Sequence, residues 1–188
     1  MRVLRGISAA IEVSNSLAVR EASLLTGADH ASDGVAEQAQ ADARSADQYL
    51  ATLAPSVDLT GQDLGGLVLT PGVYFFGSSA QLTGTLTLDA LHDANALFVF
   101  QIGSTLTTAS ASLVNVVNGS MGTSVFFDVG SSATLGTGSI FAGNILADQS
   151  ITLNTTARVL CGRAIALNGA VTMDTNAISN NCAQEGDY

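Results

Sequence analysis

The apolar and polar residues of this chain follow two different periods, one typical of a helix and the other of short strands. Between residues 35 and 54 the apolar residues recur every three or four positions, the spacing of one helical face, at Val35, Ala39, Ala43, Ala46, Leu50 and Leu53. Ser32 or Asp33 can cap the start of this segment, and Pro55 cannot continue a helix. The pattern predicts an amphipathic helix over residues 35–54.

From residue 59 to residue 178, short runs of Val, Leu, Ile, Phe and Thr alternate with Gly, Ser and Asn, which predicts strands joined by turns. These runs repeat. Ala133–Thr137, Ile151–Thr155 and Val171–Thr175 resemble one another and begin 18 and 20 residues apart. The segments between them repeat as well, since Phe98–Gly103 aligns with Val125–Gly130. Repeated units of this length, each with several strands, predict the stacked coils of a β-solenoid, so the fold class is mainly β.

Strand alternation assigns one face of these coils to the core and the other to solvent. Apolar residues are placed inward at Leu86, Leu88, Leu106, Ala133, Leu135, Ile151, Leu153, Val171 and Met173. This leaves one outward column of Thr87, Thr105, Thr134, Thr152 and Thr172. A second column, two residues earlier, holds Thr85, Gly103, Ser132, Ser150 and Ala170.

These two columns predict a flat, ordered and uncharged surface. Stacked coils are about 4.8 Å apart, and residues i and i+2 of a strand are about 6.5–7 Å apart, so the columns form a regular grid of methyl and hydroxyl groups. The high strand propensity of Thr is an alternative explanation of the pattern. However, exposed strands commonly carry charged side chains, whereas none of these positions does.

Composition and charge exclude several classes of function. Only 12% of the 188 residues are charged, against about 25% in typical soluble domains. All six basic residues are Arg, and the net charge of −10 leaves no basic surface for nucleic acid. No apolar run is long enough to span a membrane. Met1–Arg5 is charged, but Ser8 and Glu12 interrupt the apolar region that a secretory signal needs.

The titratable residues show no catalytic or metal-binding pattern. His30 and His92 lie in no recognisable nucleophile–base arrangement. Asp89, His92 and Asp93 are interpreted as a polar turn rather than a cation site. Four further aspartates, Asp63, Asp128, Asp148 and Asp174, are interpreted as turn residues. We therefore expect no enzymatic activity, no cofactor and no bound metal.

Cys161 and Cys182 are the two cysteines of the chain. They are too few for a disulfide-dense scaffold and are not spaced like zinc ligands. One disulfide that fixes the C-terminal tail, residues 179–188, is possible. Two separate thiols are the alternative.

Several segments resemble the ice-binding proteins of microbes. The resemblance covers roughly residues 25–178 and is carried by Gly65–Tyr74, Leu97–Ile102, Ile140–Ala147, Cys161–Ala164 and Asn168–Thr172. It implies a right-handed β-solenoid of triangular section with one long helix alongside. It also implies secretion and adsorption to ice through one flat face, which causes thermal hysteresis and inhibits ice growth or recrystallisation. The residues of the two columns other than Gly103 would then be the nine ice-binding residues, with ice as the partner.

The N-terminus departs from this family pattern. Family members usually begin with further strands, so residues 1–25 are expected to form atypical N-terminal strands of a single 188-residue domain. The oligomeric state stays open. One alternative function is an adhesive or structural solenoid module without ice activity. Another is a carbohydrate-active β-helix, but the repeated strands carry no acidic cluster, and the chain has no Lys or Trp.

Overall fold

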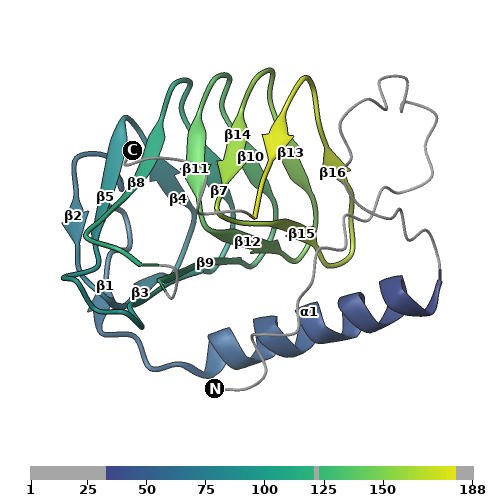
Figure 1. The fold of residues 1–188 in the computed structure, drawn as a ribbon, viewed down its shortest axis with the longest axis horizontal. Helices are drawn as coiled ribbons and strands as arrows, with labels where there is room; N and C mark the ends of the chain where they lie inside the picture. The colour runs from purple at the N-terminus through teal and green to yellow at the C-terminus, as the bar shows by residue number, and fades with distance from the viewer. Residues whose placement is uncertain (1–32, 121–122, 181–188) are drawn as a thin grey trace.

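The computed structural model describes residues 33–120 and 123–180. The predicted strands within residues 1–25 and the tail from residue 181 lie outside the described residues. One helix, α1 (Gly34–Thr52), precedes a long series of short strands. The strands assemble into three parallel sheets, and from β3 onward each turn of the chain contributes one strand to each sheet (Figure 1). The mainly β solenoid with one helix is therefore confirmed.

The three sheets form the three sides of the solenoid. Sheet A consists of β1 (Val57–Asp58), β3 (Gly72–Phe76), β6 (Leu97–Ile102), β9 (Ser124–Val129), β12 (Asn144–Ala147) and β15 (Ala164–Ala166). Sheet B consists of β4 (Ala80–Leu82), β7 (Leu106–Thr108), β10 (Ala133–Leu135), β13 (Ile151–Leu153) and β16 (Val171–Thr172). Sheet C consists of β2 (Val68–Leu69), β5 (Thr85–Asp89), β8 (Leu113–Val117), β11 (Ile140–Ala142), β14 (Arg158–Leu160) and β17 (Ala177–Ile178).

The core lies between the three sheets and is built from like residues stacked on like. Tyr74, Phe100 and Phe127 occupy successive strands of sheet A, with ring centroids 5.3 and 4.4 Å apart. Phe141 on sheet C extends the stack, 4.6 Å from Phe127. Burying these large rings stabilises the coils and fixes their register, because a slip of one residue would turn every ring outward.

Helix α1 begins and ends close to the predicted limits. Asp33 is the N-cap, and its carboxylate accepts hydrogen bonds from the backbone N–H groups of Val35 and Ala36 at 3.0 Å each. At the other end, the side-chain amide of Gln101 on β6 donates to the carbonyls of Leu50 and Leu53 at 2.7 and 2.8 Å. These contacts satisfy backbone groups that a helix end leaves unpaired.

The same helix covers the outer surface of sheet A. Ala46 and Leu50 of α1 pack against Val99, Phe126 and Leu146 of β6, β9 and β12, and all five are buried. Sheet A thus buries apolar residues on both faces, which explains the nearly continuous apolar runs in its strands. Sheets B and C are left without a covering helix among the described residues (Figure 1).

Asp128 corrects one prediction from the sequence, because it is a β9 residue rather than a turn residue. Its side chain lies on the outer face of sheet A and forms a hydrogen bond with the carboxyl of Asp47. Burial, this hydrogen bond and the charge of Asp47 raise the pKa of Asp128 to about 7. The helix–sheet interface therefore contains two neighbouring carboxyl groups, and the pKa of one of them, Asp128, is raised.

Candidate functional site

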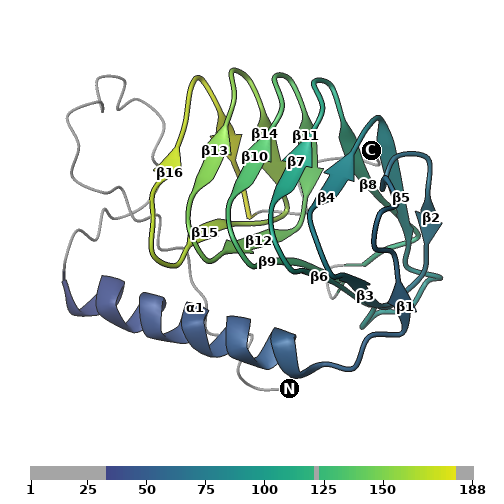
Figure 2. The same cartoon turned by 180° about the vertical axis from the view of Figure 1, so that it is seen from behind.

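Sheet B presents an outer face of aligned small and hydroxyl-bearing side chains. Its five strands lie side by side in the order β16, β13, β10, β7, β4 (Figure 2). In β10 and β13 the first and third residues are buried and the middle residue, Thr134 or Thr152, points outward. The pairing register aligns five such outward residues, here called the threonine column: Gln81, Thr107, Thr134, Thr152 and Thr172.

A second column runs beside the first, two residues earlier in each strand. Backbone hydrogen bonds link these positions from coil to coil: the N–H of Leu106 donates to Ser132 at 3.1 Å, that of Ala133 to Ser150 at 2.9 Å, and that of Ile151 to Ala170 at 3.0 Å. The N–H of Ala80 donates to Thr105 at 2.9 Å, which places Thr105 in the same series. This set, here called the serine column, consists of Ser79, Thr105, Ser132, Ser150 and Ala170.

Seven of the nine predicted residues lie on the sheet B side, while Thr85 and Thr87 do not. The seven are Thr105, Ser132, Thr134, Ser150, Thr152, Ala170 and, at the edge strand β16, Thr172. Thr85 and Thr87 belong to β5 and pair with Leu113 and Asn115 of sheet C. Their placement in the column was wrong. Strand β5 of sheet C has inward leucines, Leu86 and Leu88, and so shows the same alternation of inward and outward residues as a strand of sheet B.

The column positions of Thr105 and Gly103 were also wrong, and Thr107 was missed. Thr107, not Thr105, pairs with Thr134. The cause is Thr108, a polar residue at an inward position, which is buried and whose hydroxyl accepts a hydrogen bond from the N–H of Gly136 at 2.9 Å. The sequence pattern required an apolar residue on each side of the outward threonine. Strand β7 does not meet this condition, because Thr108 follows Thr107. Gly103 follows β6, and its N–H donates to Phe76 of sheet A at 2.8 Å.

The uncharged face ends at its first coil. Asp63 pairs with Gln81, which places a carboxylate next to the first residue of the threonine column. Asp63 accepts hydrogen bonds from the N–H groups of Gly65 and Thr83 at 2.7 and 2.8 Å. Burial would raise the pKa of Asp63, but these hydrogen bonds outweigh it and the pKa is lowered. The grid is therefore bounded by a charge on one side.

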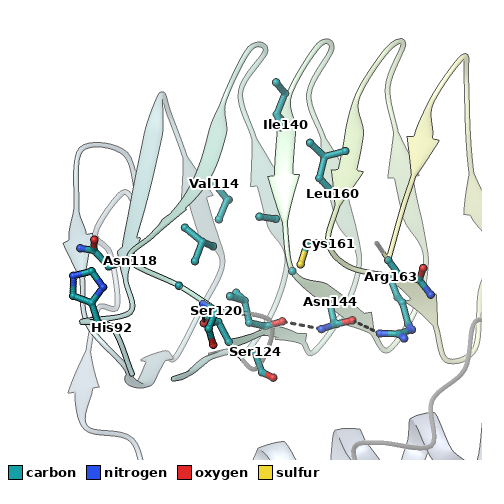
Figure 3. Close-up of a pocket in the computed structure, with 17 residues that line it drawn as sticks. His92, Val114, Asn118, Ser120, Ser124, Ile140, Asn144, Leu160, Cys161 and Arg163 are labelled. Atoms are coloured by element: carbon teal, nitrogen blue, oxygen red, sulfur yellow. Dashed lines mark hydrogen bonds between the residues drawn. The ribbon is translucent and has the colours of Figure 1, made fainter. Parts of the chain in front are cut away.

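A groove of about 660 Å³ lies along the edge between sheets C and A. Apolar side chains such as Ile140 and Leu160 line one part of it, and Asn144 and Arg163 lie at one end (Figure 3). Arg163 donates to the side-chain oxygen of Asn144 at 3.2 Å, and Asn144 donates to the carbonyl of Val125 at 3.1 Å. Burial lowers the pKa of Arg163. Among the lining residues that the structure describes, none is a carboxylate.

The polar residues considered as metal ligands have turn roles. Asp89 accepts hydrogen bonds from the N–H of Leu91 at 2.9 Å and from the side chain of Asn118 at 2.8 Å, and Asp93 accepts from the N–H of Asn95 at 2.8 Å. In the part of the chain that the structure describes, no three His, Cys, Asp or Glu side chains gather as a metal site. Within the same residues, no helix has the length and apolar character needed to cross a membrane.

The sequence over residues 3–179 matches the family described as Ice-binding-like. The chain belongs to this family. Its similarity is strong to an ice-binding protein of Nostoc sp. (strain HG1), at 64% identity over 159 residues, which is 85% of this chain and 59% of that protein. It is 36% identical over 119 residues to ice-binding protein 1 of Shewanella frigidimarina, covering 62% of this chain and 13% of that protein. The chain thus spans only part of the length of these relatives.

The fold is also that of solved ice-binding proteins. The crystal structure of the protein from the Antarctic ascomycete Antarctomyces psychrotrophicus superimposes with a TM-score of 0.76 at 37% identity, covering 84% of this chain and 77% of that chain. The structure from an Antarctic biological consortium gives a TM-score of 0.74 at 41% identity, covering 79% and 68% of the two chains. The family resemblance predicted from the sequence is confirmed.

The predicted disulfide between the solenoid and the C-terminal tail involves Cys161. Cys161 is disulfide-bonded, and Cys182, the only other cysteine of the sequence, lies outside the described residues. We expect thiol titration of the unfolded, unreduced protein to find no free thiol, and reduction to lower the stability by about 3 kcal/mol through the loss of loop-closure entropy. A Cys182→Ser variant is the control, because reduction should then change nothing. Two titratable thiols in the unreduced protein would contradict the pairing.

Proposed function

We propose that this protein binds ice through the outer face of sheet B. The observation that carries the proposal is the aligned pair of columns on that face, the threonine column and the serine column. Neither column contains a charged residue. Of the three sides, sheet A is covered by α1 and sheet C carries the groove, so sheet B offers the regular, open surface.

Such a face suits a ligand that has no charge and no protruding groups. Each contact with ice is weak, so binding depends on many contacts made at once. The side chains that make them are already ordered by folding, so they lose little conformational entropy on binding. β-Branching restricts the χ1 rotation of Thr, its methyl group is apolar, and its hydroxyl group both donates and accepts hydrogen bonds. Parallel strands about 4.8 Å apart hold these groups in a repeating array.

Adsorption then explains the effect on ice without any chemical step. An ice front that can advance only between adsorbed molecules becomes curved, and further growth requires a lower temperature. No residue acts as an acid, a base or a nucleophile in this process. We therefore propose a non-catalytic function. Secretion follows only from the family resemblance and is part of the same proposal.

The direct test is a measurement of thermal hysteresis and ice-crystal shape with the purified protein. We expect a gap between the melting and growth temperatures that increases with protein concentration, together with faceted crystals. A protein with only an adhesive or structural role would give neither. Heat-denatured protein at the same concentration is the control, because the array exists only in the folded solenoid.

A further inference from the structure

The hydroxyl groups of the serine column are engaged within the solenoid. The hydroxyl of Thr105 donates to that of Ser79 at 2.9 Å. The hydroxyl of Ser132 accepts from the N–H of Ser150 at 3.4 Å, and that of Ser150 accepts from the N–H of Ala170 at 3.3 Å. Each of these bonds joins one coil to the next. The last position, Ala170, has no hydroxyl at all.

The threonine column differs in this respect. Within residues 33–120 and 123–180, the hydroxyls of Thr107, Thr134, Thr152 and Thr172 form no hydrogen bond with protein atoms. Each hydroxyl thus keeps its donor and both acceptor sites for an external partner. The methyl groups lie beside them at the same spacing. The two columns are adjacent, yet only the threonine column has all of the hydrogen-bonding capacity of its hydroxyls free.

Gln81 interrupts the threonine column on β4. It stands in register with Thr107, and its neighbours Ala80 and Leu82 are buried like the residues on either side of Thr134. The backbone of β4 therefore already has the geometry of a sheet B strand. A Gln side chain is longer than Thr and loses more rotational freedom when it is fixed. It does not continue the array of methyl and hydroxyl groups.

We propose that the threonine column alone is the row that contacts ice, and that Gln81 limits its length. This inference rests on the proposed ice-binding function and assigns different roles to two columns that look alike in the sequence. The serine column fills the surface and joins the coils. A threonine at position 81 would add one more contact position, about 4.8 Å beyond Thr107.

A matched pair of substitutions in one coil tests the division between the columns. Thr152→Ala removes one hydroxyl from β13, and Ser150→Ala removes one from the position directly before that strand. Thr152→Ala should bind ice about fivefold more weakly, as expected for one lost hydrogen bond, and should leave the melting temperature of the protein unchanged. Ser150→Ala should lose less ice affinity than Thr152→Ala and should unfold at a slightly lower temperature, because it removes a bond between coils. Equal losses of ice affinity in both variants would overturn the proposal.

Gln81→Thr tests the limit of the row, with Gln81→Ala as its control. We expect the Thr variant to bind ice more tightly than the wild type, and the Ala variant to show no such gain. Ice affinity is measured as the fraction of fluorescently labelled protein taken up by a growing ice crystal, alongside thermal hysteresis. No gain from Gln81→Thr in a folded protein would refute the role of Gln81. If the wild type itself shows neither uptake nor hysteresis, the proposed function fails instead.

Discussion

Thr152→Tyr should abolish most of the thermal hysteresis while the solenoid remains folded. Thr152 lies on an inner strand of sheet B, in register with Thr134 on one side and Thr172 on the other. Its side chain points outward, so a larger side chain meets no core residue. The aromatic ring projects beyond the neighbouring threonines and holds the whole face away from a flat ice surface. Because adsorption depends on many simultaneous contacts, one obstruction weakens them all.

Thr85→Tyr is the matched control for this experiment. It is the same substitution at an exposed threonine, but Thr85 lies on β5 of sheet C. We expect this variant to fold and to keep the full hysteresis. Circular dichroism and the melting temperature verify folding in both cases. If Thr152→Tyr kept its activity and Thr85→Tyr lost it, the ice-binding face would have to be moved to sheet C. Asn144 is unsuitable as a control, because its side chain is bonded to Val125 and Arg163.

The sequence was sufficient to predict the solenoid because the repeat is a local property. Each coil repeats the same alternation, and stacking similar residues is the only way to bury them all. The helix was likewise predictable, since its N-cap Asp33 and the following Pro55 are local signals. The match between Ile151–Leu153 and Val171–Thr172 even gave the correct register at the C-terminal coils.

The first coils could not be aligned in the same way. The inward position of β7 is filled by Thr108, whose hydroxyl replaces the expected apolar contact with a hydrogen bond to Gly136. The register of Thr105 and Thr107 therefore depends on a tertiary contact. The sequence did contain one unused signal. Ala80–Gln81–Leu82 has the same pattern as Ala133–Thr134–Leu135, and it identifies β4 rather than β5 as the strand of sheet B.

The covered side of the solenoid was not predicted either. A helix long enough to lie along the coils could pack against any of the three sheets. The runs Phe98–Phe100 and Val125–Phe127 are apolar at every position, which indicates strands buried on both faces. This pattern indicates that sheet A is the side covered by the helix. Asp128 directly follows the second run and continues the same strand, so it lies beneath α1 and not in a turn.

Asp128 makes the stability of the protein depend on pH. The carboxyl is held between β9 and α1, with Gln101 and Leu146 as its neighbours in register on sheet A. Asp47 is the charged group that faces it from the helix, while Arg44 of α1 donates to the carbonyl of Leu167 at 3.5 Å. Burial, followed by the hydrogen bond and the charge of Asp47, raises the pKa of Asp128 from 3.8 to about 7.

The direction of the effect follows from the raised pKa. Between pH 4 and pH 7, roughly, the folded protein holds a proton on Asp128 that the unfolded chain has already released. The free energy of unfolding therefore falls as the pH rises through this window, and this group causes no further change above it. Asp128→Asn should remove the dependence and make the protein more stable than the wild type at pH 8. The gain should be on the order of 1–2 kcal/mol after allowance for solvent screening.

Urea unfolding measures this effect. It is carried out at pH values from 4 to 9, spaced roughly one pH unit apart to resolve the window. Asp93→Asn is the control, since it removes the same charge from an exposed turn and should leave the slope intact. An unchanged slope in Asp128→Asn would show that Asp128 does not cause the pH dependence. Thermal hysteresis of the folded Asp128→Asn variant should equal that of the wild type, because Asp128 lies on sheet A and not among the two columns of sheet B.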